Sequence, residues 1–132
     1  MPDIAQFTLL RRATINDAIR ELGAGIEQRA GPGRAPYLDL AGSSLPDEDS
    51  PAPPRLLPMW DSILMAYADR SRVIPETYRR TIIRTNGDTL PTLLVDGHVA
   101  GVWRPVEGGI QATAFHALSD EAWAGLEAEA RA

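Results

Sequence analysis

The segment from Leu93 to Arg104, LLVDGHVAGVWR, constrains the fold of this chain more than any other. Two apolar runs flank the pair Asp96-Gly97, and both of these residues accept the positive φ angles of a two-residue type I′ turn. The segment therefore predicts an antiparallel β-hairpin. Its residues alone leave three roles open for the hairpin, which are packing in a core, lining a DNA groove and forming the wall of a small-molecule pocket.

Further apolar runs extend this hairpin into an antiparallel sheet. We expect a meander of three strands, over Leu90 to Val95, His98 to Arg104 and Ile110 to His116. Thr81 to Arg84 is predicted to be a further strand, followed by a tight turn at Asn86 to Asp88. Gly101 predicts a close approach between backbones, and Trp103 is expected to fill the core or to flank a groove.

Two helices are predicted beside this sheet. The first is short, and its apolar face consists of Trp60, Ile63, Leu64 and Tyr67. The second follows Ser119, a good N-cap residue, and buries Trp123 and Leu126. Its first turn contains Asp120 and Glu121, which suit the positive end of the helix dipole.

A proline-rich acidic segment, Gly42 to Pro54, divides the chain. It reads GSSLPDEDSPAPP and has no periodic apolar face, so we predict that residues 42–54 form a surface linker. The predicted fold class is α+β, with a partial winged-helix-like segment at residues 1–41 and an antiparallel lobe with a C-terminal helix at residues 55–132. A length of 132 residues with 44% hydrophobic content is enough for one domain or for two small lobes, and it excludes a large multidomain enzyme.

The N-terminal segment has the element order of the later part of a winged helix. Pro2 to Thr8 is predicted to be a short helix, and Thr14 is the expected N-cap of a second helix. Gly25 to Arg29 and Pro36 to Leu40 are expected strands that flank the loop AGPGRA. The segment leaves no room for the first helix that such a domain needs.

Polar side chains of this segment are candidate DNA contacts. If its second helix entered a major groove, phosphates or base edges would be in reach of Arg11, Arg12, Asn16 and Arg20. Arg29 and Arg34 would lie on the wing near the DNA backbone. The first 34 residues contain five arginines and four acidic residues, and winged helices also serve as protein–protein spacers, so both roles stay open.

The most basic stretch of the chain runs from Asp69 to Arg84, where five arginines face two acidic residues. Arg79 and Arg80 are further candidate DNA contacts. Asp69, Arg70 and Arg72 form a DRxR cluster that is either an ion-paired cap or a functional arginine pair. The formal net charge of the whole chain is -5, which does not favour nucleic acid on bulk charge alone. All 13 basic residues are arginine, which we attribute first to a GC-rich genome and second to selection for bidentate contacts.

Several kinds of chemistry are excluded or unsupported. The chain has no cysteine, which rules out disulfides, thiolate nucleophiles and iron–sulfur clusters. We predict no metal site, no cofactor and no catalytic residue. His98 and His116 titrate near neutral pH but lack a partner nucleophile or acid, so they are expected to be surface residues. No apolar run approaches the length of a membrane span, and MPDIAQF lacks the features of a signal peptide, so a cytoplasmic location and no membrane contact are expected.

Two motifs resemble a known bacterial family. The run LLPMWDSILMAYADRSRV, followed about 20 residues later by PTLLVDGHVAGVWRP and a C-terminal helix, resembles the C-terminal region of the winged helix DNA-binding domain-containing proteins. That family includes the AlkZ-like DNA glycosylases. The resemblance runs from Ile4 to the end of the chain, with DIAQFTLLRRATINDAI as the final helix-turn-helix. Its most specific parts are LLP with Asp61 and Asp69-Arg70, and LVDGHVAGVW.

The resemblance implies contact with DNA but carries over no catalytic residue. Glycosylases of the family excise alkylated bases and unhook interstrand crosslinks with two glutamines, one residue apart, that orient a water molecule. Here Gln6, Gln28 and Gln111 are isolated from one another. Members of the family are longer, with tandem winged helices before the matched region, so the chain is similar to their C-terminal third.

Three functions follow as hypotheses. The first is a DNA-binding module that binds double-stranded DNA weakly and without sequence preference. The second is a fragment or subunit of a glycosylase acting on alkylated bases, with glutamines supplied by another polypeptide. The third is a homodimeric structural or interaction domain. An incomplete winged helix would leave one apolar side under-covered, so we expect a second copy or a missing winged-helix region to cover Ile15, Ile19 and Leu22.

Overall fold

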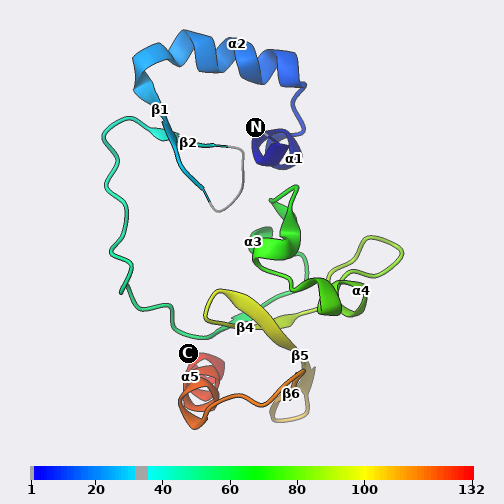
Figure 1. Ribbon diagram of the computed structural model, residues 1–132. Helices are drawn as coiled ribbons and strands as arrows, with labels where there is room; N and C mark the ends of the chain where they lie inside the picture. The colour runs from blue at the N-terminus through cyan, green and yellow to red at the C-terminus, as the bar shows by residue number, and fades with distance from the viewer. Residues whose placement is uncertain (1, 32–35) are drawn as a thin grey trace. The chain divides into compact units, whose positions relative to one another are not determined.

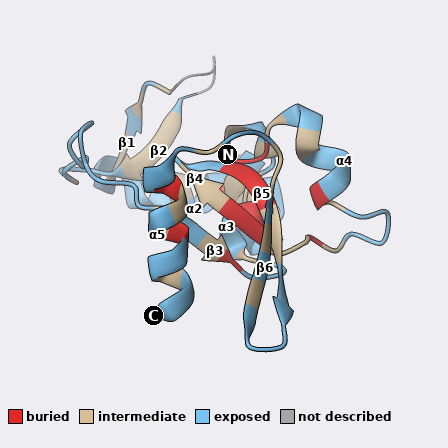
Figure 2. Ribbon diagram, turned by 90° about the horizontal axis from the view of Figure 1, so that it is seen from below, coloured by how far each residue is buried: buried red, intermediate tan, exposed pale blue. Residues whose placement is uncertain are grey.

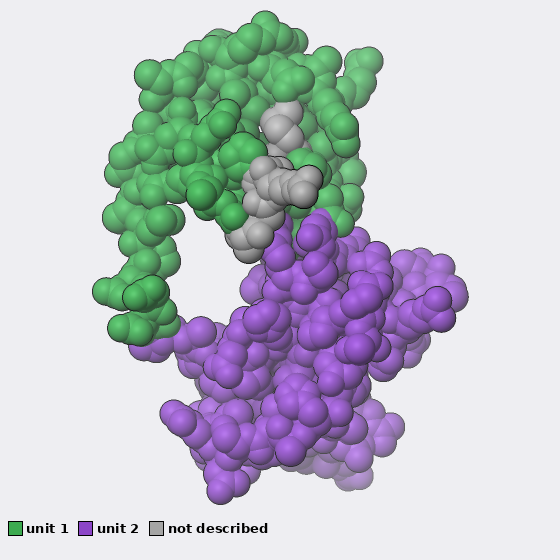
Figure 3. Space-filling model, viewed as in Figure 1, with its two compact units in different colours: residues 1–50, 66–68 green, residues 51–65, 69–132 purple. Residues whose placement is uncertain are grey.

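The chain divides into two units, which Figure 3 shows in different colours. This computed structural model describes residues 2–31 and 36–132. Unit 1 comprises residues 1–50 and 66–68, and unit 2 comprises residues 51–65 and 69–132. Residues 41–54, all of them described, contain no helix or strand. The finer division into a winged-helix segment, a linker and a lobe stays a prediction.

In its described part, unit 1 consists of two helices followed by a hairpin (Figure 1). The elements are α1 (Pro2–Thr8), α2 (Arg12–Leu22), the 3-10 turn η1 (Gly23–Gly25), β1 (Ile26–Arg29) and β2 (Tyr37–Leu40). The two strands are antiparallel, with Ile26 opposite Leu40. This is the order of elements that the sequence predicts.

The start of α2 differs from the prediction. Thr14 was the expected N-cap, but Arg11 takes that position, with extended backbone angles and no side-chain cap bond. Leu9 has a φ of 58° and reverses the chain just before it. The helix therefore begins at Arg12, and the Arg11 carbonyl accepts the N–H of Ile15 at 3.2 Å. Thr14 lies inside the first turn as a result.

Unit 2 is built on a four-stranded antiparallel sheet in the order β3-β4-β5-β6. The strands are β3 (Arg55–Leu57), β4 (Thr92–Val95), β5 (His98–Val106) and β6 (Gly109–Ala114). The helical elements are α3 (Ser62–Met65), the 3-10 turns η2 (Arg70–Arg72) and η3 (Glu76–Tyr78), α4 (Arg79–Ile82) and α5 (Asp120–Arg131). The predicted α+β class, with antiparallel sheets and a C-terminal helix, is confirmed.

The Asp96-Gly97 hairpin forms as predicted and joins β4 to β5. Asp96 has a φ of 48° and Gly97 a φ of 75°, so both residues occupy the left-handed region that the turn requires. The register then shifts, because Leu94 is opposite Val99 whereas Leu93 is opposite Gly101. Ala100 is the extra residue of this β-bulge, and its carbonyl accepts the N–H of Phe115 at 2.9 Å.

The core of unit 2 lies against β4 and β5, where Figure 2 shows buried residues in red. Its fully buried hydrophobic side chains are Leu64, Ile74, Ile82, Leu93 and Val99. Trp103 of β5 links its strand to β3, because its indole Nε1 donates to the Leu57 carbonyl at 2.9 Å. Helix α5 adds buried Leu126 and is capped as predicted, with the Ser119 hydroxyl accepting the N–H of Ala122.

Two predicted elements of unit 2 are wrong. Thr81 to Arg84 is not a strand, because α4 continues to Ile82 and only Ile83 forms an isolated bridge, with Thr89. The helical turn is what places Ile82 in the core. Trp60 is not part of the core either, since it is 59% exposed with a φ of 61°, and α3 begins only at Ser62.

Gly101 is the position of unit 2 that tolerates a side chain least. A Cβ there would lie 2.4 Å from the Thr113 carbonyl oxygen and 2.9 Å from the Ala114 Cα. We expect Gly101→Ala to lower the free energy of unfolding by about 1–3 kcal/mol, because backbone atoms of β6 must move. Urea unfolding followed by tryptophan fluorescence measures this in unit 2, which contains all three tryptophans.

The matched control for this prediction is Gly109→Ala on β6. A Cβ at Gly109 meets no atom within 4 Å. Its free energy of unfolding should stay within about 0.5 kcal/mol of the wild type. Equal losses in the two variants would contradict the packing argument.

Candidate nucleic-acid interface

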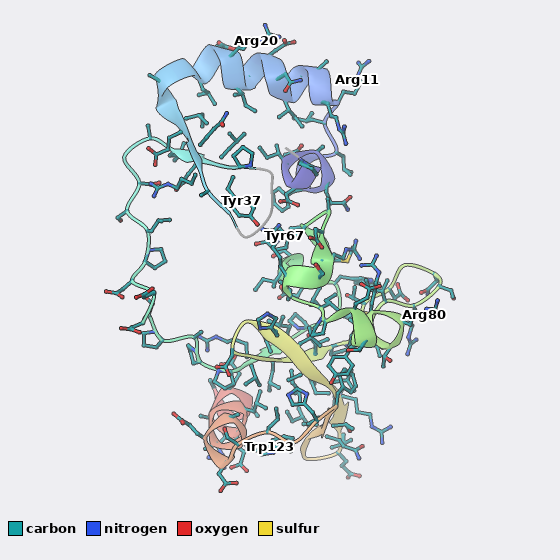
Figure 4. All side chains as sticks on the ribbon, in the orientation of Figure 1. Arg11, Arg20, Tyr37, Tyr67, Arg80 and Trp123 are labelled. Carbon is teal, nitrogen blue, oxygen red and sulfur yellow. The ribbon has the colours of Figure 1, made fainter. Side chains whose placement is uncertain are left out.

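The first candidate surface is the outer face of α2. Arg12, Asn16 and Arg20 are exposed and lie four residues apart, so they form one row along the helix. Ile15, the one buried residue of the helix, lies outside this row and is 4% exposed. Figure 4 shows the labelled Arg11 and Arg20 near opposite ends of α2. The structure thus brings three predicted DNA contacts onto α2 and places the fourth, Arg11, at its N-cap.

The positive charge of this row is concentrated at the start of the helix. Arg20 forms an ion pair with Asp17, and Glu21 follows it in the sequence. Among the described residues, no carboxylate pairs with Arg11 or Arg12. Because the N-terminal end of a helix also carries the positive end of the dipole, this end of α2 is the one that favours an anion.

The two arginines predicted on the wing are Arg29, which the structure describes, and Arg34, which it does not. Arg29 is neutralised inside unit 1, because it pairs with Glu27 and lies 2.9 Å from an Asp39 carboxylate oxygen. Its Nη2 also donates to the Ser43 carbonyl at 2.6 Å. Arg29 therefore holds the hairpin to the chain that follows it and is not free to bind a phosphate. Arg34 lies outside the described residues.

The second candidate surface is the basic segment Asp69 to Arg84 of unit 2. One backbone hydrogen bond fixes it to the sheet, from the Val99 N–H of β5 to the Val73 carbonyl at 2.8 Å, and a second joins it to the segment before β4, from Leu90 N–H to the Ile82 carbonyl at 3.0 Å. Ile74 and Ile82 are fully buried beside these bonds. The apolar residues of the segment therefore point into the core and its charged residues remain outside.

Asp69 caps the DRxR cluster. Its carboxylate accepts the Ser71 hydroxyl at 2.6 Å and the Ser71 N–H at 3.0 Å. These two hydrogen bonds, assisted by the charges of Arg72 and Arg79, hold the pKa of the Asp69 carboxyl below its ordinary value. Asp69 is therefore ionised at neutral pH and caps the turn with its side chain, while a functional role for the arginine pair stays a prediction.

The exposed arginines of the basic segment follow the cap. Arg79 and Arg80 are exposed on α4, and Arg84 is exposed in the loop after it. Within residues 2–31 and 36–132, none of these three side chains forms an ion pair with a carboxylate. Arg84 was counted in the sequence as part of the basic stretch but not selected as a contact. A short cationic surface with exposed guanidinium groups results, of the kind that binds phosphate.

Acidic residues gather on a different element of unit 2. Helix α5 contains Asp120, Glu121, Glu127 and Glu129. Its arginine Arg131 pairs with Glu127 at 3.0 Å, and Arg55 of β3 pairs with Glu129 at 2.7 Å. The arginines near α5 are therefore neutralised by carboxylates, unlike those of α4.

The two histidines and Gln111 each make a local contact in unit 2. The Nδ1 of His98 lies 2.8 Å from the Asp96 carbonyl oxygen, and that of His116 lies 3.4 Å from the Tyr78 hydroxyl. Gln111 accepts a hydrogen bond from Arg104 at 2.7 Å. No cluster of three metal-binding side chains occurs in the described part of the chain. None of the helices described is long and apolar enough to cross a membrane.

An apolar cavity of about 360 Å³ lies in unit 1, between α1, α2 and the hairpin. Ile15 and Ile19 line its inner side, and Leu22 and Leu40 at its margin are 55% and 65% exposed. The predicted under-covered face therefore exists in part. Whether a second copy covers it stays a prediction.

Comparison with known proteins places this geometry in a family. No curated protein matches the chain. A solved structure, the DNA glycosylase AlkZ of Streptomyces sahachiroi, is similar to it with a TM-score of 0.73 and 20% identity. The similarity covers 96% of this chain but 36% of that one, so the chain spans about a third of the length of this relative, and at this identity it shows the fold alone. The family described as "DNA glycosylase AlkZ-like" matches residues 1–132, and the chain therefore belongs to the AlkZ-like DNA glycosylase family.

Proposed function

We propose that this chain is a DNA-binding module of the AlkZ-like family, without a catalytic motif of its own. The observation that carries the proposal is the basic segment of unit 2, where Arg79, Arg80 and Arg84 are exposed and form no ion pair within the described chain. Guanidinium groups form charge-assisted hydrogen bonds with phosphate, and bidentate geometry suits them. Family membership supports a role in DNA repair.

Helix α2 is the proposed second contact. Arg11 and Arg12 would bind phosphates, and the Asn16 amide, which both donates and accepts, would reach phosphates or base edges. Arg20 is weakened as a contact by its pairing with Asp17. Arg34 is included as a proposed DNA contact because the sequence places it in the predicted wing. In this interpretation residues 1–41 act as a partial winged helix, joined through residues 42–54 to the lobe of residues 55–132.

The proposed binding is weak and independent of sequence. Most of the candidate groups are arginines suited to phosphates, which position a protein on DNA without identifying bases. The formal net charge of -5 opposes the approach of a polyanion. Each phosphate contact releases counterions, so the logarithm of the binding constant should fall with the logarithm of salt concentration by about 0.9 per contact.

Removing two exposed arginines from α4 should weaken DNA binding and its dependence on salt. We expect Arg79→Ala with Arg80→Ala to make the log–log salt slope shallower by about 1.8, because two phosphate contacts are lost. Arg11→Ala with Arg12→Ala should act in the same direction through α2. Fluorescence anisotropy with a labelled 20-base-pair duplex, titrated at several salt concentrations, measures both effects.

The matched control is Arg55→Ala with Arg131→Ala, which changes the net charge equally but removes arginines already paired with Glu129 and Glu127. Its salt slope should equal that of the wild type. A control as weak in binding as the α4 variant would show that bulk charge, not the basic segment, governs the interaction. Binding insensitive to salt would refute the proposal.

The chain alone should not release a damaged base. Cleavage of a glycosidic bond needs an extruded base, a positioned water and stabilisation of the sugar cation. The chain lacks paired glutamines, and Gln111 already accepts a bond from Arg104. Incubation with duplex containing an alkylated purine, followed by alkaline cleavage, should give no strand breaks above a buffer control. Breaks above that control would instead favour a glycosylase fragment with a site of its own.

A second candidate function is self-association through unit 1, favoured by its apolar cavity with exposed margins. Leu22→Ser with Leu40→Ser should shift the chain toward monomer, because both side chains lie at that margin. Leu45→Ser is the control, since Leu45 is exposed but does not line the cavity. Light scattering at two concentrations measures the mass. A monomeric wild type at high concentration would exclude this candidate.

A further inference from the structure

Trp60 is the one large apolar residue of unit 2 that is both exposed to solvent and in a left-handed backbone conformation. It is the most exposed large hydrophobic residue of unit 2, at 59%, and its φ of 61° is a left-handed conformation that tryptophan rarely adopts. Burial does not explain this conformation, because the side chain is largely in solvent. The conformation must be held by its polar contacts.

Two hydrogen bonds fix Trp60 in place. Its backbone N–H donates to the hydroxyl of Thr89, a fully buried residue, at 2.8 Å. Its indole Nε1 donates to an Asp88 carboxylate oxygen at 3.2 Å. The other Asp88 oxygen accepts the Asn86 amide at 2.6 Å, which holds the carboxylate in turn. The indole is therefore fixed along one edge, while most of the residue remains open to solvent.

The same aspartate connects Trp60 to the basic segment. The Asp88 carbonyl accepts the backbone N–H of Arg84 at 2.8 Å, so Arg84 is bonded to the backbone and Trp60 to the side chain of the same residue. Arg84 is exposed, and Arg80 lies one helical turn before it. An exposed indole and an exposed arginine that forms no ion pair in the described chain are therefore connected through one residue, Asp88.

We propose that Trp60 is a stacking platform for an unpaired nucleobase, with Arg84 and Arg80 binding the phosphates on either side of it. Proteins that bind unpaired DNA combine aromatic rings, which stack on bases of any sequence, with cationic groups along the backbone. Fixing the indole in advance reduces the entropy lost on stacking. This inference rests on the proposed DNA binding and adds the kind of DNA recognised.

The test compares two labelled DNAs, a fully paired 20-base-pair duplex and the same duplex with a three-nucleotide thymine bulge. Trp60→Ala should weaken binding to the bulged DNA about tenfold, the scale of one lost base stack, and leave the paired duplex within about twofold. Trp60→Phe keeps an aromatic ring and should retain most of the affinity for the bulge. Met59→Ala, at an exposed apolar neighbour, is the control and should change neither.

A second measurement separates stacking from a merely structural role. Bulged DNA should quench tryptophan emission of the wild type, and the quenching should be lost in Trp60→Phe, whose Trp103 and Trp123 remain. Urea unfolding of Trp60→Phe should show a folded unit 2. If the paired duplex binds in a salt-dependent way but Trp60→Ala and the wild type bind the bulge equally, the stacking proposal is overturned and the DNA-binding proposal stands. If neither DNA binds, both are overturned.

Discussion

The close approach of β5 to β6 at Gly101 is the contact on which unit 2 depends. The Thr113 carbonyl oxygen lies 2.4 Å from where a Cβ of residue 101 would be, so the strands pair this closely only with glycine. The bulge at Ala100 comes directly before this contact and shifts the register of β4 against β5. On the other side of the bulge, Val99 donates its N–H to Val73 and so fixes the basic segment. The position of the arginine-rich segment therefore depends on the geometry of the β4–β5 hairpin.

This arrangement explains how a segment rich in arginine stays ordered without being neutralised. Elsewhere in this chain arginines are held by carboxylates, as Arg55 is by Glu129 and Arg29 by Asp39. In the basic segment the backbone is held instead, by buried Ile74 and Ile82 and by hydrogen bonds to β5 and to the segment before β4. The charge of the side chains is then left available for a ligand. That separation of anchoring from charge is what favours an interface over a solvated surface.

Structural features that depend on residues close together in the chain could be predicted from the sequence. The Asp96-Gly97 turn, the meander around it and the Ser119 cap each depend on neighbouring residues, and all were predicted correctly. Long-range contacts decide the rest. Ile82 is drawn into the core, which makes α4 helical where β propensity predicted a strand. The neutralisation of Arg29 depends on Asp39 across the hairpin, which the spacing along the chain does not reveal. For Trp60 a local signal existed, because Asp61 accepts the N–H of Ile63 and so starts the helix after the tryptophan.

Local rather than net charge decides whether such a chain can meet DNA. At physiological salt, exposed charges are screened over about 8 Å, so a phosphate responds mainly to the groups around it. The acidic residues of α5 lie on another element than Arg79 and Arg80, and two of them, Glu127 and Glu129, are paired with Arg131 and Arg55. A net charge of -5 then limits affinity without preventing contact at the basic segment. Under such weak attraction, stacking on a fixed aromatic ring adds a short-range interaction that salt does not screen. In the proposed binding, Trp60 therefore supplements the weak electrostatic attraction of the arginines.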